Sequence, residues 1–553
     1  MDPEQPGFAE KQFLNAPVET LSWTGLTVTV KESKTGQPKT LPDNVEGIVQ
    51  AGECCALMGP SGCGKTTFLN VLAQQAITKA SHVGGQILVN GNQVPASVFR
   101  HVTSFVQDHD IFIGALNAKE TLHFASRLAG ISHGGEAKAR VDALLESFGL
   151  VDQTTSRVET GLSHGQKRRL TVANQLVTGP SILFLDEPTS GLDSVASCHV
   201  ISYLRQLAKR TGLSSQLIDY YTTIGVTVPE RANPADFLLE LVNTDFVQNQ
   251  AAASERERVA ELASRWDTSA LRQRNHEVIV SESARRAPDL TLDAESKPTF
   301  LAQLVVLIHR SFIKAFRDAM AYNWRLTMYA SLGVLQGTIW LRMDRDQDSI
   351  QLLINALLVS CGFMAFLAIT YVPAFLEDYR QFRLDRRNGL YDAGSFLLSN
   401  LIVGLPYVFL FSWPFSLMFY FLGNLRHSAS AFFTWTAWLY LKVLAAEGVV
   451  ILSVVMVPNF VGAMVVACLW NVVAFATAGV LVPPAHLNAF YKYVFYYWNY
   501  QGYVFQDQCH IAGETVLDQF GVKTADQGRN VRIVVAIILG YRLAAWILLK
   551  MRH

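Results

Sequence analysis

Gly59-Pro60-Ser61-Gly62-Cys63-Gly64-Lys65-Thr66 is the stretch that decides the fold of the first half of this 553-residue chain. It matches the pattern G-x-x-x-x-G-K-[ST] at every position. Residues 53–58 before it predict a short buried strand, and residues 67–73 after it predict the start of a helix. In this context the glycines let backbone N–H groups turn towards a phosphate, the lysine reaches the outer phosphates, and the threonine holds Mg²⁺. We therefore predict a nucleoside triphosphate site that runs from Gly59 to Thr67.

The composition divides the chain into two parts. Half of the residues are hydrophobic, and Lys and Arg together equal Asp and Glu at 46 each, a balance that argues against nucleic acid as the main partner. The residues up to about position 320 are charged, whereas the rest contains long uncharged apolar runs. Residues 1–16 lack the apolar core of a signal peptide, so we expect the first part to stay in the cytoplasm. The seven cysteines have no metal-site spacing, and Cys54-Cys55 falls in the predicted buried strand.

A second informative segment is Gly161-Leu162-Ser163-His164-Gly165-Gln166-Lys167-Arg168-Arg169. Ser163 precedes a helical stretch and is a suitable N-cap. Further on, residues 181–185 predict an apolar strand that ends in Asp186-Glu187. A carboxylate at a strand end beside a phosphate loop can hold Mg²⁺, and its neighbour can orient an attacking water. Upstream, residues 26–30 alternate like an edge strand, and Trp23 either stacks on an adenine ring or is an ordinary packed aromatic.

Together these residues resemble a known family. The phosphate loop, L-S-H-G-Q, I-L-F-L-D-E and S-G-L-D, in that order, are similar to the ATP-binding cassette of ABC transporters. The stretches E-T-L-H-F-A and N-P-A-D-F, with several later ones in the apolar half, resemble the G subfamily of half-transporters. The resemblance covers nearly the whole chain. It implies an α/β P-loop nucleotide-binding domain followed by an all-α transmembrane domain with six helices.

The resemblance also implies roles for individual residues. Lys65 and Thr66 would bind phosphates and Mg²⁺, Gln107 would sense the metal and the water, Asp186 would complete the Mg²⁺ site, and Glu187 would be the general base. The ATP held by a second subunit would be contacted by Ser163 and Gly165, with Gln166 and Asp193 at the same interface. His164 stands where the family usually has glycine, and it could either crowd the phosphate or add a charge.

The chain departs from the family after Asp193. In the family a further strand follows and ends in a histidine that contacts the γ-phosphate, but here residues 195–210 predict a helix. We find no buried-strand run followed by histidine before Asn233, and we expect His199 on a helix surface without a role. A segment that includes a strand beside the Asp186 strand is therefore expected to be missing near 211–215. A skipped exon or a mis-spliced gene model is one interpretation, and a degenerate cassette is the other.

We expect three regions: a nucleotide-binding domain over 1–243, a cytoplasmic linker over 244–298, and a transmembrane domain over 299–553. Residues 301–316 predict an amphipathic helix that lies against the bilayer, with His309, Arg310, Lys314 and Arg317 on one side. Six spans follow, each near the roughly 20 residues that a bilayer needs: 324–341, 350–375, 396–422, 431–457, 460–482 and 531–549. Both termini would then be cytoplasmic, in a membrane that the sequence does not identify.

Several charged and aromatic residues in this half have two interpretations. Asp385-Arg386 either matches an acidic–arginine pair that faces the cassette in the family or only sets topology. Lys442 and Glu447, inside the fourth span, are either functional or paired with each other. Asn471 and the aromatics Phe432, Trp435 and Trp438 could line a path for hydrophobic cargo or pack in the core. Cys509 could form a disulfide between subunits or be a free thiol.

The hypothesis from the sequence is an ATP-driven half-transporter that works as a dimer with Mg²⁺ and exports a hydrophobic small molecule or lipid across a membrane. One phosphate loop and one signature segment do not complete a site alone, so a second half-transporter subunit, the same or different, would be the partner. The alternative is a catalytically impaired or mis-spliced cassette that acts as a non-transporting regulatory partner.

Overall fold

The structure of this protein is a computed structural model. It describes residues 16–31, 37–41, 43–75, 80–130, 135–208, 214–229, 233–242, 250–285, 289–291, 298–318, 322–344, 349–478, 481–482, 486–503 and 527–552. The chain forms two compact units. Unit 1 contains Met1–Asp110, Asn117–Pro298 and Arg387–Leu390, and unit 2 contains Ile111–Leu116, Thr299–Arg386 and Tyr391–His553.

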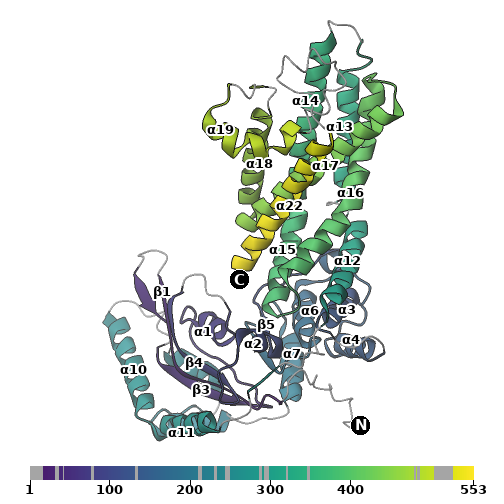
Figure 1. The fold of residues 1–553 in the computed structure, drawn as a ribbon. Helices are drawn as coiled ribbons and strands as arrows, with labels where there is room; N and C mark the ends of the chain where they lie inside the picture. The colour runs from purple at the N-terminus through teal and green to yellow at the C-terminus, as the bar shows by residue number, and fades with distance from the viewer. Residues whose placement is uncertain are drawn as a thin grey trace. The chain divides into compact units, whose positions relative to one another are not determined.

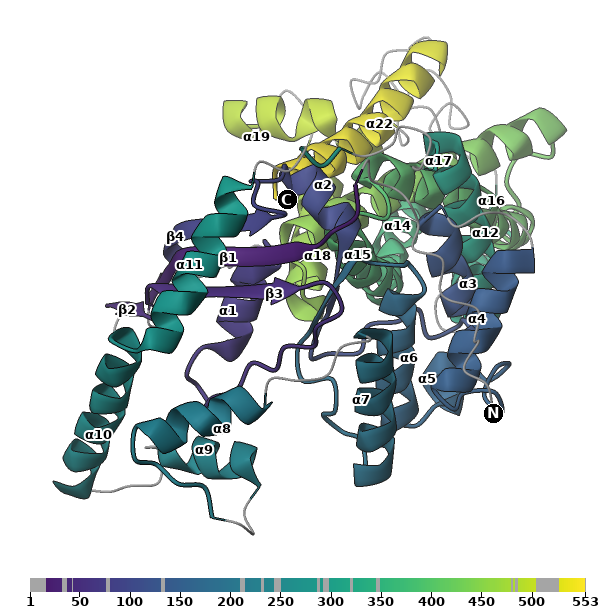
Figure 2. The same cartoon turned by 90° about the horizontal axis from the view of Figure 1, so that it is seen from below.

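Unit 1 contains an antiparallel sheet of four strands: β1 (Thr20–Lys31), β2 (Pro38–Thr40), β3 (Val45–Gln50) and β4 (Ala80–Val89). β1 pairs with β2 and β3 and also with β4, so it is a central strand and the predicted edge strand is wrong. Helix α11 (Ala270–Ala284) packs on β3 and β1 (Figure 2), and its Arg272 Nε lies 3.2 Å from the Glu46 carboxylate of β3. Trp23 is buried against Phe68, which favours the packed-aromatic interpretation.

A second sheet places the residues of the site. Strands β5 (Thr103–Val106) and β6 (Ile182–Leu185) are parallel, with Val106 opposite Leu185. The pairing continues one step further, because the Asp186 amide donates to the Val106 carbonyl over 3.0 Å. Helix α1 (Lys65–Leu72) follows the phosphate loop as predicted, and helix α6 (His164–Leu176) packs on β5. Gln107 and Asp186-Glu187 thus emerge side by side at the same sheet edge.

The predicted buried strand at 53–58 is wrong. These residues have no strand structure, and residues 54–58, including Cys54 and Cys55, are exposed. Leu57 and Met58 each expose 45% of their surface. Within the described residues β6 is bonded to β5 alone, so this segment has no parallel neighbour to pair with. A strand needs a partner for its backbone N–H and C=O groups, and composition alone does not supply one.

The stretch after Asp193 is helical where it is described. It contains α7 (Ser194–Ala208), α8 (Ser214–Thr223) and α9 (Pro234–Val242), and the described residues between Asp193 and Asn233 include no strand. His199 is exposed on α7, as expected. Residues 209–213 lie outside the described part. The other helices of unit 1 are α2 (Ala96–Val102), α3 (Ala118–Leu128), α4 (Gly135–Ser147), α5 (Val158–Gly161) and α10 (Gln250–Asp267).

Unit 2 is helical, and its long helices run side by side along one direction (Figure 1). In chain order they are α12 (Phe300–Arg317), α13 (Trp324–Ile339), α14 (Ile350–Leu367), η4 (Ala368–Tyr371), α15 (Val372–Arg387), α16 (Ala393–Leu422), α17 (Ala429–Met456), α18 (Phe460–Ala476), α19 (Ala489–Val494), η5 (Tyr496–Trp498) and α22 (Gln527–Met551). Within the described residues, four helical stretches are long and apolar enough to cross a membrane: 351–387, 393–422, 429–456 and 528–551. α18 is apolar but shorter.

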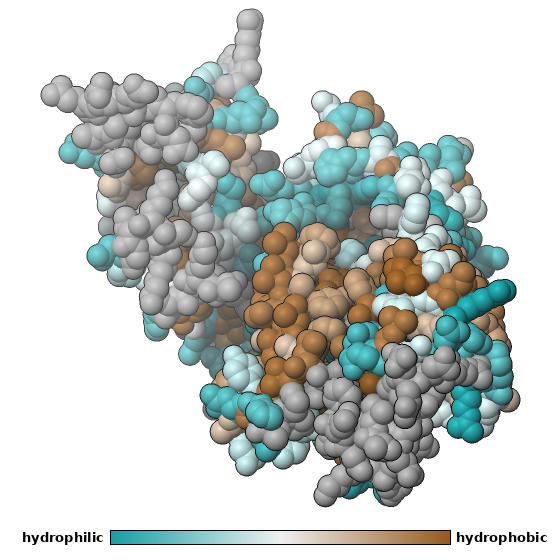
Figure 3. Space-filling model, turned by 90° about the horizontal axis from the view of Figure 1, so that it is seen from above, coloured by the Kyte–Doolittle hydropathy of each residue, from teal (hydrophilic) through white to brown (hydrophobic). Residues whose placement is uncertain are grey.

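The interior of unit 2 is apolar and aromatic. Phe432, Trp435 and Trp438 are buried in one hydrophobic cluster, which supports packing over a cargo path. Asn471 is fully buried, and it accepts a hydrogen bond from the Tyr500 hydroxyl over 2.7 Å. Large apolar side chains are also exposed on α13, α16, α17, α18 and α22. Hydrophobic residues gather in one broad area of the face drawn in Figure 3.

The charged residues of unit 2 pair differently from the sequence-based predictions. On α12, Arg310 and Lys314 are buried, not on an exposed polar face. Arg310 lies 3.0 Å from Asp385, while Lys314 lies 2.7 Å from both Glu377 and Asp378 of α15.

The pairing between Lys442 and Glu447 is also wrong, because Glu447 forms a buried ion pair with Arg325 of α13. Asp385 likewise bonds Arg310 and Tyr391, and the Arg386 guanidinium donates to the Leu549 carbonyl. These contacts all lie within unit 2, so whether Asp385-Arg386 faces the cassette or only sets topology stays a prediction. Cys509 falls outside the described residues.

Candidate nucleotide site

The phosphate loop has the backbone that its glycines predict. Gly62 and Gly64 have φ values of +76° and +102°, in the left-handed region that only glycine adopts without strain. Gly64 is the N-cap of α1, so the backbone N–H groups of the first helical turn face the loop. The Lys65 ammonium donates to the carbonyls of Gly59 and Pro60, both over 2.7 Å. The loop thus holds its lysine against its own backbone, in reach of an anion seated on it.

Thr66 and Asp186 are 120 positions apart in the sequence but are in contact in the structure. The Thr66 hydroxyl donates to a carboxylate oxygen of Asp186 over 3.2 Å. The helix after the phosphate loop and the end of β6 therefore place one hydroxyl and one carboxylate together. Hydroxyl and carboxylate oxygens, with the amide oxygen of a residue such as Gln107, are the hard ligands that Mg²⁺ prefers. The residues present fit that ion.

The electrostatics of Asp186 also suit a cation. The residue is buried, with 7% of its surface exposed. Burial raises the pKa of Asp186, and the negative charges of Asp108 and Glu187 raise it further, against the opposing Thr66 hydrogen bond and Arg168 charge. A nearby divalent cation would lower the pKa of Asp186 again, because it favours the ionised carboxylate. Glu187 follows in the left-handed region at φ +47°, unusual for a residue other than glycine, and its side chain is exposed.

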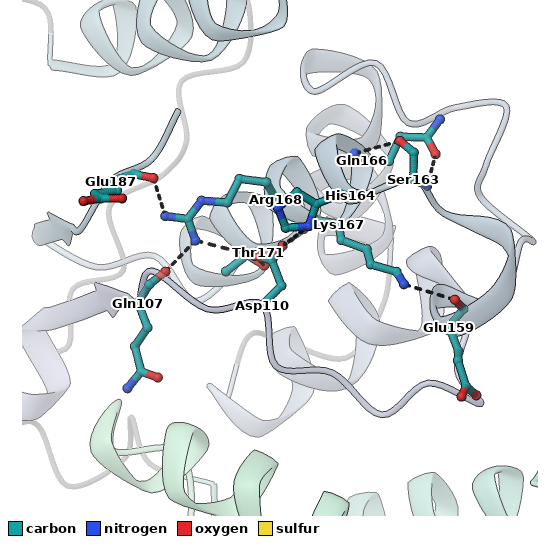
Figure 4. Close-up of polar contacts among 10 residues, drawn as sticks. All are labelled: Gln107, Asp110, Glu159, Ser163, His164, Gln166, Lys167, Arg168, Thr171 and Glu187. Atoms are coloured by element: carbon teal, nitrogen blue, oxygen red, sulfur yellow. Dashed lines mark hydrogen bonds and ion pairs between the residues drawn. The ribbon is translucent and has the colours of Figure 1, made fainter. Parts of the chain in front are cut away.

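The signature segment begins α6 with a complete capping box. The Gln166 amide donates to the Ser163 hydroxyl over 3.3 Å, and the Ser163 amide donates to the Gln166 side chain over 2.8 Å (Figure 4). The predicted N-cap is confirmed. The Asp193 carboxylate caps the next helix by accepting from the Ala196 amide over 2.7 Å. Ser163 and Asp193 are exposed, and no hydrogen bond in the described part of the chain joins Ser163 or Gly165 to the phosphate loop.

His164 contacts two neighbouring loops. Its Nδ1 lies 3.9 Å from the Asp110 carboxylate, and Figure 4 shows the ring directed towards Asp110. On another side the ring packs against Gly191, where an added Cβ would lie 2.4 Å from it. Gly191 has φ +75°, so both space and backbone require glycine there. The ring is still 73% exposed.

Sequence reasoning missed Arg168. It lies one turn into α6 and is 1% exposed. Its guanidinium donates to the carbonyls of Gln107 and Glu187 (Figure 4) and of Asp186. These are the three residues that the resemblance implies for the metal and the attacking water. The structure therefore groups Thr66, Asp186, Glu187 and Gln107 around the ends of β5 and β6, with a buried cation between the two strand ends.

Two family models match this chain. A model described as ABC transporter matches residues 42–190, and one described as ABC-2 type transporter matches residues 302–507. The first contains the phosphate loop, the signature segment and Asp186-Glu187. The second contains most of the apolar half.

Curated proteins from plants and an amoeba are similar over most of the chain. ABC transporter G family member 1 of Petunia hybrida is 28% identical over 528 positions, which cover 88% of this chain and 83% of that protein. Member 11 of Arabidopsis thaliana is 26% identical over 617 positions, covering 98% and 87%. Member 8 of Dictyostelium discoideum is 28% identical over 435 positions, covering 71% and 66%.

Proposed function

We infer that this chain, which belongs to the G subfamily of ABC transporters with its nucleotide-binding domain first and its membrane domain second, works as one half of a dimeric exporter of a hydrophobic small molecule or lipid. The observation that carries the proposal is the meeting of Thr66 and Asp186 beside the phosphate loop. It supports a Mg-ATP site, and the apolar helices of unit 2 support a membrane path.

Each residue at the site has a proposed task. Backbone N–H groups of residues 61–67 and the Lys65 ammonium would hold the β- and γ-phosphates. Thr66, Asp186 and the Gln107 side chain would hold Mg²⁺, which neutralises charge on the transferred phosphoryl group when bound. Glu187 would accept a proton from the attacking water. Its exposed side chain beside Asp186 is consistent with that task.

A second subunit is required by the same proposal. Ser163, Gly165 and the N-terminus of α6 are exposed or half-buried, and they have no bond to this chain's own phosphate loop in the described residues. A helix N-terminus stabilises anionic ligands, so this end of α6 is suited to the γ-phosphate held by a partner. Binding of two ATP molecules would then close the dimer, and hydrolysis would open it.

A shortened cassette is also proposed. The alignment with the Arabidopsis relative has 617 positions, more than the 553 residues of this chain, so that relative has residues without a counterpart here. We place the missing residues near 211–215, because the described residues between Asp193 and Asn233 include helices but no strand, and β6 pairs with β5 alone. Sequencing the transcript across codons 210–216 tests the placement. A transcript whose added exon encodes a strand there would support it, and continuous reads matching these 553 codons in every transcript would argue for a natural short form.

The test of function uses the full chain, purified and reconstituted in lipid nanodiscs. We expect Mg-ATP hydrolysis, and we expect Glu187→Gln to lower kcat by at least about 100-fold, because it removes the general base. Glu146→Gln, a change of an exposed carboxylate on α4, is the matched control and should leave kcat unchanged. A folded wild-type dimer that binds Mg-ATP but does not turn it over would instead support the regulatory subunit. Absence of Mg-ATP binding would refute both.

A further inference from the structure

Arg168 is a buried cation without an assigned task. Its side chain is 1% exposed and lies on the face of α6 turned towards β5 and β6. Nη1 donates to the Gln107 carbonyl over 2.5 Å, while Nη2 donates to the carbonyls of Asp186 and Glu187 over 2.5 and 2.6 Å. One planar guanidinium therefore holds three backbone oxygens from two strand ends.

These bonds begin where the sheet ends. The last backbone bond between the two strands is the one from the Asp186 amide to Val106. Among the described residues, no backbone hydrogen bond joins residues 107–110 to residues 187–190. Arg168 supplies donors at that point, and its fork of five N–H groups suits several acceptors at once. Lysine, with a single ammonium on a flexible stem, does not reproduce this arrangement.

Arg168 contacts only the backbone carbonyls of these three residues, so their side chains take no part in holding the guanidinium. In Figure 4 the Gln107 and Glu187 side chains point away from the guanidinium. Glu187 has a left-handed backbone, which is unfavourable for this residue, and its carbonyl is one of the three that Arg168 holds. Arg168 thus fixes where the side chains start without using the groups that would contact metal or water.

The charge of Arg168 is balanced beside it. Asp110 Oδ1 lies 3.5 Å from Nη1 and also accepts from the Thr171 hydroxyl over 2.7 Å. Thr171 is on α6, one turn after Arg168, and Asp110 follows the Gln107 loop. The ion pair is therefore a second tie between α6 and the loop after β5. The negative charge of Asp110 also offsets part of the desolvation cost of burying the guanidinium.

We propose that Arg168 is a positioning residue that locks the strand ends carrying Gln107, Asp186 and Glu187 to the signature helix α6. The inference rests on the proposed function of this site. When α6 meets the γ-phosphate held by a second subunit, Arg168 transmits its position to the metal-binding and water-activating side chains. Hydrolysis and the gain in affinity that Mg²⁺ provides would then depend on Arg168, whereas binding of metal-free nucleotide to the phosphate loop would not.

The experiment compares Arg168→Lys with Arg169→Lys in the full-length dimer in nanodiscs. Arg169 is the matched control, because it is the next residue on α6 and its guanidinium donates to the Phe148 carbonyl, away from both strand ends. We expect Arg168→Lys to lower kcat by about tenfold to a hundredfold, as misplacement of catalytic groups does. Arg169→Lys should keep kcat within about twofold.

A second readout does not depend on turnover. The Kd of a fluorescent ATP analogue is measured with and without Mg²⁺. Arg168→Lys should lose the gain in affinity that Mg²⁺ gives the wild type, and Arg169→Lys should retain it. A purely structural role predicts less folded protein but normal kcat and Mg²⁺ dependence per folded dimer, and that result would overturn the proposal.

If Arg168→Lys does not fold, the variant Asp110→Asn tests the same inference. It removes the counter-charge but leaves Arg168 in place, so a smaller loss of kcat, about threefold to tenfold, is expected. Unchanged kcat and Mg²⁺ dependence in Asp110→Asn would then refute the inference. Failure of the proposed function has a different signature, since the wild type itself would bind no Mg-ATP.

Discussion

The ionised carboxylate of Asp186 destabilises the folded protein when no cation is bound beside it. Burial raises its pKa, so the folded protein binds a proton more tightly here than the unfolded chain does. This contribution to folding is favourable below the unfolded pKa and is lost as pH rises through the folded pKa. At neutral pH without Mg²⁺ the ionised carboxylate therefore destabilises the fold. We expect Asp186→Asn to raise the melting temperature of the nucleotide-free protein, measured by scanning fluorimetry at pH 7.

The same substitution should remove the rise in melting temperature that wild type gains from Mg-ATP over ATP with EDTA. The advantage of Asp186→Asn should also shrink as the pH is lowered, since the wild-type carboxyl then becomes protonated. Glu146→Gln is the comparison, because Glu146 is exposed on α4 and its substitution should leave both melting temperatures unchanged. A nucleotide-free Asp186→Asn protein that melts below wild type at pH 7 would contradict this account.

At this scale, motifs indicated most residues of the candidate site but not its buried cation, Arg168. The phosphate loop, Ser163 and Asp186 could be predicted because their chemistry is local and their spacing is specific. Arg168 is the middle of three consecutive basic residues, and only the fold shows which one points inward. The available signal was helical spacing, since Arg168, Thr171 and Gln175 are three and four positions apart and share one face.

Helices α13 and α17 are joined by the buried pair of Arg325 and Glu447. The guanidinium also lies 4.6 Å from the Phe411 ring centroid on α16. Removing one partner leaves an uncompensated buried charge. We expect Glu447→Met to lower the free energy of unfolding by about 3–5 kcal/mol and Arg325→Met/Glu447→Met to recover most of that loss. Denaturant titration of the reconstituted protein measures both.

The exposed pair of Arg265 and Glu261 on α10 is the control for the variants of Arg325 and Glu447. Glu261→Gln should cost no more than about 0.5 kcal/mol, since solvent screens an exposed pair. The single variant Arg325→Met is measured as well. If the loss in the double variant equals the sum of the losses in Glu447→Met and Arg325→Met, the two helices are not joined through this pair.

Helices and strands could be predicted where the residues within the element determine its structure. Helices α1, α6 and α7 and strand β6 could be predicted from periodicity and caps. The segment 53–58 has the composition of a strand but no partner, because strand formation depends on residues distant in sequence. The partners of Glu447 and Lys314 could not be predicted either, since each lies on another helix 63 to 122 positions away.

At the scale of the whole molecule, the chain passes between its two compact units more than once. Residues Arg387–Leu390 belong to unit 1, although the chain on both sides of them belongs to unit 2. Asn388 secures this segment inside unit 1. Its side chain donates to Gln175 of α6 over 2.7 Å and accepts from the Phe105 amide of β5 over 3.3 Å. Because this segment is covalently continuous with α15 and α16, we expect movement of α6 or β5 to reach those helices along the chain.

We expect Asn388→Ala to separate hydrolysis from movement of the membrane helices. The catalytic side chains are untouched, so kcat for Mg-ATP should stay within about threefold of wild type. The change in hydrogen exchange of α16 amides that ATP with vanadate induces in the wild type should be lost, because the segment no longer follows α6. Asn355→Ala, an exposed change on α14, should keep both properties. A normal exchange response in Asn388→Ala would show that the two units communicate by another route.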